Sequence, residues 1–161
     1  MDIQSSQPHP DLPDKTWVVV EQPADEEYRL KYDPAQNRFT RTEVKSLTHM
    51  RGFTGAYGWL GGLGYPPHSH LDVLIITKQS PHAGDVLLAH ICGIFYRGDG
   101  DHKLVALDDQ LIHTVARADL DCLDATTYAN LIGMYPRVDA NEGWFSAEEA
   151  KKYLNRVLRY E

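Results

Sequence analysis

The sequence predicts an α+β domain in which helices pack on a small, barrel-like antiparallel sheet. The first observation is that short runs of β-branched and apolar residues, separated by turn residues, fill the chain as far as Leu107. The second is that the last third changes to helical spacing and contains a capping box at Ser146-Ala147-Glu148-Glu149. A chain that places its strands before its helices is typical of this fold class.

Length and composition indicate a single globular domain. The chain has 161 residues, of which 42% are hydrophobic and 24% charged, enough for one core. No apolar run approaches the roughly 20 residues that cross a membrane, and the first residues lack a signal-peptide pattern. The two cysteines have no metal-like spacing, which favours free thiols in a reducing compartment. We therefore expect a cytoplasmic protein without a membrane partner.

The net charge of −7 argues against nucleic acid as a partner, because phosphate contacts need a basic surface. A small anionic ligand stays compatible with this charge, since a few placed cations can reverse the field locally.

The elements follow in order along the chain. Residues 1–15 are polar and proline-rich, so we expect a flexible N-terminal arm, followed by a single domain over residues 16–161. A glycine-dense segment at residues 52–64 predicts tight turns. Helical spacing covers residues 119–135, and the capping box opens a final helix. Strands are predicted at residues 16–21, 28–33, 38–44, 72–77, 86–96 and 103–107.

Two groups of polar residues are candidates for a site. His68, His70 and Asp72 alternate along an extended segment and therefore point the same way, just before the apolar run at residues 73–76. Such a triplet on a buried strand suits a metal or catalytic site. In the predicted hairpin, Arg29 and Lys31 share one face, and Arg41 on the returning strand can converge with them; solvated edge charges are the alternative.

Several segments, in this order, resemble the soluble inorganic pyrophosphatases of the first family, from about Trp17 to the C-terminus. The matching segments are Glu21-Gln22-Pro23 at the end of the first strand, Tyr57-Gly58-Trp59, Leu71-Asp72-Val73-Leu74-Ile75, Asp101-His102-Lys103-Leu104-Val105-Ala106-Leu107, Met134-Tyr135 and Glu142-Gly143-Trp144. The resemblance implies a five-stranded, OB-like barrel with flanking helices that hydrolyses diphosphate to two phosphates with several Mg²⁺ ions. It also implies a homo-oligomer that takes a small phosphate-containing substrate.

The resemblance also assigns roles to residues of this chain. Asp72 and Tyr57 are the predicted catalytic residues, and Arg29 or Lys31 fills a lysine position beside the substrate. The implied phosphate-binding residues are Arg41, Lys103, Tyr57 and Tyr135, and the implied metal ligands are Glu21, Asp72, Asp99 and Asp101. Carboxylates suit Mg²⁺ because it prefers hard oxygen ligands.

The chain departs from the family pattern directly before Asp72, where two signature carboxylates are missing. Pro67 and Ser69 stand in their places without a gap, and His68 and His70 do so with a one-residue deletion. Two alternatives therefore remain beside a Mg²⁺-dependent phosphohydrolase. One is a repurposed site in which His68, His70 and Asp72 bind Zn²⁺, Mn²⁺, Fe²⁺ or Ni²⁺. The other is a non-catalytic protein that binds an anion or a protein partner.

Overall fold

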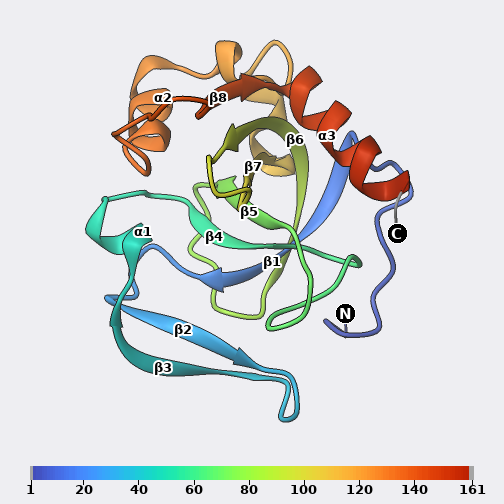
Figure 1. Cartoon of the computed structure of the whole chain (residues 1–161), viewed down its shortest axis with the longest axis vertical. Helices are drawn as coiled ribbons and strands as arrows, with labels where there is room; N and C mark the ends of the chain where they lie inside the picture. The colour runs from blue at the N-terminus through green and yellow to red at the C-terminus, as the bar shows by residue number, and fades with distance from the viewer. Residues whose placement is uncertain (1, 160–161) are drawn as a thin grey trace.

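A closed five-stranded barrel forms the centre of the molecule, as predicted. The structure is a computed structural model that describes residues 2–159. The barrel strands in spatial order are β1 (Lys15–Gln22), β4 (Ala56–Leu60), β5 (Asp72–Ile76), β7 (Lys103–Asp108) and β6 (Val86–Tyr96). The barrel closes because β6 also pairs with β1 (Figure 1).

One strand pair corrects the expectation of a wholly antiparallel sheet. Strands β5 and β7 are parallel, and their first residues, Asp72 and Lys103, are register partners. The reason is that β6 lies between them in sequence and serves as the crossover that a parallel pair requires. This register brings the side chains of Asp72 and Lys103 to the same end of the barrel.

The predicted hairpin is present as a separate two-stranded sheet. It consists of β2 (Tyr28–Asp33) and β3 (Arg38–Lys45), with Asn37 in the left-handed region at φ 49° in the turn. The short helix α1 (Leu47–Met50) then leads back to the barrel, and the hairpin lies beside β1 and β4 (Figure 1).

The helical third is divided more finely than its spacing predicts. After the 3-10 helix η1 (Asp109–Thr114), residues 119–135 form the 3-10 helix η2 (Leu120–Cys122) and the helix α2 (Ala125–Ile132). Helix α2 begins separately from η2 because Asp124 caps its N-terminus, where the Asp124 side chain accepts a hydrogen bond from the Thr127 N–H at 2.8 Å. One half of the predicted capping box is present at the start of α3 (Ala147–Arg159), where Ser146 Oγ accepts from the Glu149 N–H at 3.4 Å. The Glu149 side chain instead accepts from the Tyr96 hydroxyl at 3.0 Å. A short strand not predicted, β8 (Gly143–Ser146), pairs with β6.

Both faces of the barrel strands are buried, which explains their continuous apolar runs. On β5, Val73 and Ile75 belong to the cluster that all five barrel strands share with α3. Leu74 and Ile76 belong to a second cluster, which η2 and α2 cover. Val19, Tyr32 and Trp59 form a third cluster under the hairpin. The barrel therefore supplies a rigid frame for side chains at its strand ends.

The N-terminal arm lies against this frame. Ile3 packs beside the third cluster, Leu12 packs beside the first, and Gln4 Nε2 donates to the Tyr32 hydroxyl at 2.9 Å. Flexibility of residues 1–15 stays a prediction. Across residues 2–159, no helix is long and apolar enough to cross a membrane.

Gly58 lies where β4 comes very close to β1, so a substitution at this position tests the close approach. A Cβ at this position would lie 1.9 Å from the carbonyl oxygen of Val19. We expect Gly58→Ala to lower the free energy of unfolding by roughly 1 to 3 kcal/mol, the usual cost of overpacking. Urea denaturation measures this, with Gly98→Ala as the control because its nearest atoms are side-chain atoms of Glu142 at 3.7 Å or more. Equal losses in the two variants would contradict the close approach.

Candidate functional site

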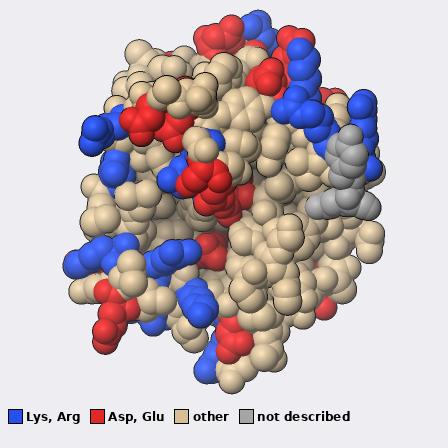
Figure 2. Space-filling model, in the orientation of Figure 1, with Lys and Arg blue, Asp and Glu red and all other residues tan. Residues whose placement is uncertain are grey.

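A buried ion pair lies where β5 and β7 begin. Lys103 Nζ donates to Asp72 Oδ2 at 2.7 Å, to Asp101 Oδ2 at 3.0 Å and to the Tyr57 hydroxyl at 3.0 Å. The side chains of Lys103 and Asp72 are only 5% and 12% exposed, whereas Asp101 is 58% exposed. Figure 2 shows acidic and basic side chains gathered around a hollow in this face of the molecule. The cluster of Tyr57, Asp72, Asp101 and Lys103 is called the Lys103 cluster below.

The fold places these side chains together. Asp72 and Lys103 are partners in the parallel register, and Asp101 lies in the turn that enters β7. Tyr57 comes from β4, the other neighbour of β5. The Tyr57 hydroxyl is buried beside the Asp72 carboxylate, and this burial, together with the negative charge, raises the pKa of Tyr57. Tyr57 is therefore a neutral hydrogen-bonding group in this site.

His70 contacts the other oxygen of Asp72. Its Nε2 lies 3.0 Å from Asp72 Oδ1, and its Nδ1 lies 2.7 Å from the carbonyl oxygen of His68. Burial alone would raise the pKa of the Asp72 carboxyl, but the hydrogen bond from His70 and the charge of Lys103 outweigh burial and lower it. The same hydrogen bond from His70 to Asp72 raises the pKa of His70. Asp72 is consequently ionised and held on both oxygens.

Glu21 reaches the site through a β-bulge. The register of β1 against β4 shifts between Val20 and Gln22, so Glu21 is the extra residue. Its carboxyl is buried, with the residue 8% exposed. Burial raises the pKa of Glu21 to about 7, and the charge of Arg29, second in size, opposes the rise. The charges of Asp72, His70 and Lys103 also act on the pKa of Glu21.

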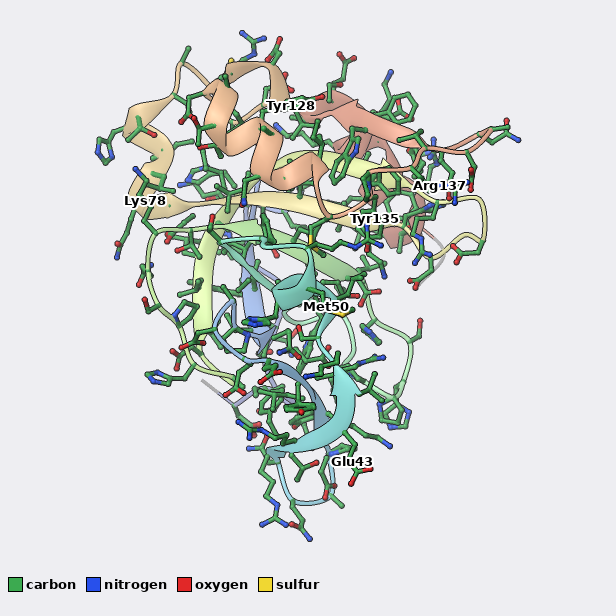
Figure 3. All side chains as sticks on the ribbon, turned by 90° about the vertical axis from the view of Figure 1, so that its left-hand side faces the viewer. Glu43, Met50, Lys78, Tyr128, Tyr135 and Arg137 are labelled. Carbon is green, nitrogen blue, oxygen red and sulfur yellow. The ribbon has the colours of Figure 1, made fainter. Side chains whose placement is uncertain are left out.

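Tyr135 and Arg97 form one wall of the site. Tyr135 stacks on Phe95 with ring centroids 4.6 Å apart, and the Arg97 guanidinium lies 5.4 Å from the centre of the Tyr135 ring. Arg97 also pairs with Asp99 at 3.5 Å and with Asp101 at 3.8 Å. Sequence reasoning did not select Arg97, although it opens the same acidic turn. Figure 3 shows Tyr135 on the segment that follows α2 and labels Arg137, two positions further along that segment.

Arg41 lies apart from the Lys103 cluster. Its register partner is Leu30, so Arg41 shares a face with Leu30, while Arg29 and Lys31 occupy the opposite face of β2. Arg41 pairs with Glu26 at 3.2 Å and lines a separate hollow of about 720 Å³. The register therefore corrects the expectation that all three cations converge. Arg29 is the one whose charge acts on Glu21.

The predicted metal ligands do not assemble into a metal centre. Within residues 2–159, no group of three or more His, Cys, Asp or Glu side chains is arranged to hold a metal ion. The ring of His68 lies against Tyr65, with centroids 5.4 Å apart, and Asp99 accepts from the Asp101 N–H at 3.0 Å. Between Asp72 and Asp101 the structure places the Lys103 ammonium. The residues present thus do not fit the several Mg²⁺ ions that the resemblance implies, nor a His68/His70 centre for a softer metal.

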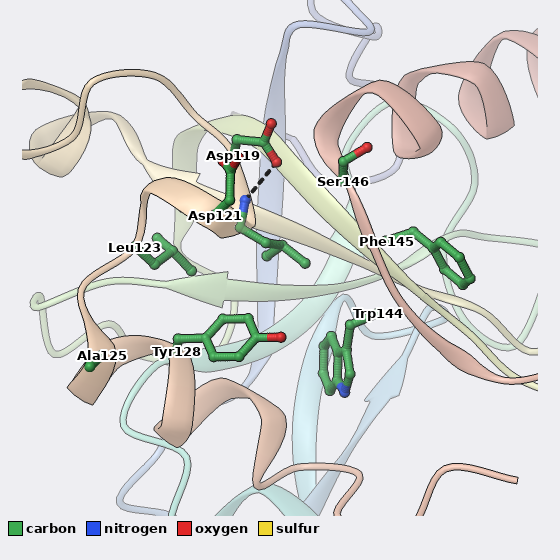
Figure 4. Close-up of a pocket in the computed structure, with 9 residues that line it drawn as sticks. Asp119, Asp121, Leu123, Ala125, Tyr128, Trp144, Phe145 and Ser146 are labelled. Carbon is green, nitrogen blue, oxygen red and sulfur yellow. Dashed lines mark hydrogen bonds between the residues drawn. The ribbon is translucent and has the colours of Figure 1, made fainter.

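Another hollow, of about 540 Å³, lies between η2, α2 and β8 (Figure 4). Tyr128, Trp144 and Phe145 line it. Of its two acidic residues, Asp119 accepts at Oδ1 from the N–H groups of Leu120 at 2.8 Å and Ala147 at 3.2 Å, and Asp121 pairs with Arg117 at 2.9 Å. This mostly apolar hollow therefore has no buried ammonium group like that of the Lys103 cluster among its lining residues.

The raised pKa of Glu21 predicts how stability varies with pH. The folded protein keeps the Glu21 proton up to about pH 7, whereas the unfolded chain releases it near 4.5. Stability from this group is present at low pH and is lost as the pH rises from about 5 to about 8, by roughly 3 kcal/mol. The measurement is urea denaturation of wild type and Glu21→Gln across this range. The stability gained by Glu21→Gln should grow with pH; a constant difference would contradict the buried carboxyl.

Comparison with known proteins identifies the fold. No protein-family model matches the sequence. The inorganic pyrophosphatase of Neisseria gonorrhoeae matches with a TM-score of 0.73 and 22% identity, over 97% of this chain and 96% of that chain. That of Helicobacter pylori has a TM-score of 0.71 and 20% identity, over 98% of each chain. That of Ehrlichia chaffeensis has a TM-score of 0.70 and 18% identity, over 92% of this chain and 96% of that chain.

Proposed function

We propose that this chain, which has the fold of inorganic pyrophosphatases, binds a small phosphate-containing anion at the Lys103 cluster and hydrolyses its phosphoanhydride bond. Diphosphate is the substrate to test first, because the structurally similar solved proteins carry the name inorganic pyrophosphatase. The observation that carries the proposal is the buried Lys103 ammonium, which donates to Asp72, Asp101 and the Tyr57 hydroxyl. Its charge also acts on the buried carboxyl of Glu21, whose pKa burial raises to about 7.

Hydrolysis of a phosphoanhydride mainly requires positioning and neutralisation of negative charge. Lys103 has three donors on its ammonium, the Arg97 guanidinium pairs with Asp101, and the charge of Arg29 acts on Glu21. The hydroxyl of Tyr57 adds a neutral donor. In this proposal an entering phosphate displaces the weakly held, exposed Asp101 from Lys103, because Asp101 is far more exposed than Asp72.

Glu21 is the proposed general base. A base with a pKa near the working pH is partly ionised there and still accepts a proton from water efficiently. The pKa of Asp72 is too far lowered for this task, so Asp72 keeps Lys103 and His70 in place. Each proposed step uses groups of this chain alone, and none is assigned to a metal ion.

The test is phosphate release from diphosphate by the full chain, with and without added Mg²⁺ after treatment with EDTA. We expect release that depends on Glu21, measured against Glu26→Gln, a surface control in which the altered carboxylate faces Arg41. No phosphate release in either condition would overturn hydrolysis of diphosphate.

Binding without hydrolysis is a second candidate. It is favoured by the missing signature carboxylates at Pro67 and Ser69, and by the occupation of both Asp72 oxygens by internal donors. Calorimetric titration with imidodiphosphate, whose bridging nitrogen resists hydrolysis, separates the candidates. A single site combined with no phosphate release would favour this second function. The predicted homo-oligomer and cytoplasmic location stay predictions.

A further inference from the structure

The surroundings of His70 determine how its ring is protonated. The carbonyl oxygen of His68 and the carboxylate of Asp72 are both hydrogen-bond acceptors, and they lie against the two different ring nitrogens of His70. Each nitrogen must therefore carry a hydrogen. A ring with hydrogens on both nitrogens has no lone pair for a metal, so His70 faces Asp72 as a cation and donor.

Aromatic packing holds this ring in place. Trp59, which is 1% exposed, lies edge-on to His70 with ring centroids 6.4 Å apart. Tyr65 packs against His68 in the same way at 5.4 Å, which fixes the carbonyl group that His70 contacts. The segment before β5 is thus built around the contact of His70 with Asp72.

Two side chains of this protein, His70 and Lys103, already neutralise the charge of the Asp72 carboxylate. His70 Nε2 contacts Asp72 Oδ1, and Lys103 Nζ donates to Asp72 Oδ2. Lys103 also lies between Asp72 and Asp101, so a dication there would meet an ammonium group about 3 Å from both carboxylates. Like charges at such distances repel strongly where water is scarce.

From these contacts we infer that His70 and Lys103 serve as the counter-ions of Asp72 in place of metal ions, and that the site takes a phosphate-type anion without a divalent cation. This inference explains both the missing signature carboxylates before Asp72 and the presence of His70. The positive charge of His70 takes the place of the charge of a metal ion, and the His70 ring is not itself a metal ligand. The part about anion binding without a divalent cation rests on the proposed function. The part about the counter-ions of Asp72 does not depend on it.

The experiment is calorimetric titration of the EDTA-treated full chain with Mg²⁺, Mn²⁺ and Zn²⁺, in the absence of any phosphate. We expect that none of the three metals binds stoichiometrically at Asp72. The wild type should therefore show no binding heat that Asp72→Asn removes. We expect His70→Asp to gain Mg²⁺ affinity by at least about tenfold, the scale of effects from groups around a metal. His68→Asp is the matched control, because the His68 ring contacts Tyr65.

Two further measurements keep the inference testable if His70→Asp folds poorly. Nitrogen-15 NMR of the wild-type His70 ring is expected to show hydrogens on both nitrogens at pH 7. Affinity for imidodiphosphate is expected to change less than about threefold between EDTA and Mg²⁺ buffers. Stoichiometric Mg²⁺, Mn²⁺ or Zn²⁺ binding that Asp72→Asn abolishes would overturn the inference, even if diphosphate is hydrolysed. Loss of hydrolysis alone would overturn the proposed function and leave the metal result intact.

Discussion

Replacement of Glu21 by glutamine is expected to lower the turnover of diphosphate by about two to four orders of magnitude, the usual contribution of a general base. Glutamine keeps the size and burial of the side chain but cannot accept a proton from water. The fold should survive, because the wild-type carboxyl is itself protonated below about pH 7. Steady-state phosphate release measures the effect.

Binding separates this role from a structural one. Glu21→Gln should bind imidodiphosphate with an affinity within a few fold of wild type, so that the loss falls on kcat. Glu26→Gln should retain wild-type turnover, since its carboxylate contacts Arg41 away from the Lys103 cluster. An equal fall in both variants, or a loss confined to KM, would exclude Glu21 as the base.

Replacement of Lys103 by methionine is expected to lower the free energy of unfolding by roughly 3 to 5 kcal/mol. The methionine keeps most of the side-chain volume but leaves the Asp72 carboxylate buried beside an apolar group. Lys103 is 5% exposed and gives hydrogen bonds to three partners, so water cannot easily replace its ammonium. Urea denaturation at pH 7 gives the value.

A double-mutant cycle with Asp72→Asn isolates the ion pair. The double variant should be less destabilised than the sum of the two single variants, because neither charge is then left without its partner. Additive losses would mean that the two side chains contribute independently, against the 2.7 Å contact. Lys151→Met, which removes an exposed pair with Asp14, should change stability by less than about 1 kcal/mol.

The sequence allowed the architecture to be predicted because its local signals agree with the fold. Apolar runs marked four of the five barrel strands, β1, β5, β6 and β7, and the capping box marked the start of α3. The remaining barrel strand, β4, lies in the glycine-dense segment that was expected to form tight turns. The parallel pairing of β5 with β7 could not be read from these runs, because strands buried on both faces look alike in either direction. The short β8 is half exposed and carries a weak pattern.

The sequence allowed several residues of the site to be predicted, but much less of how these residues are placed relative to one another. Asp72, Tyr57 and Lys103, selected by resemblance, do lie in contact, although their predicted roles are still untested. A bulge places Glu21, and a one-residue difference in register separates Arg41 from Arg29. Such shifts reverse the face of a side chain without any sign in the sequence. The contact of His70 with Asp72 depends on a turn that periodicity does not describe.

The pH dependence of diphosphate hydrolysis by the wild-type protein tests the central claim most directly. If Glu21 is the base, kcat/KM rises about tenfold per pH unit below pH 7 and levels off above it, because the pKa of Glu21 is about 7. Glu21→Gln should remove this rise. A profile without an inflection near pH 7, or one that Glu21→Gln leaves unchanged, would contradict the account.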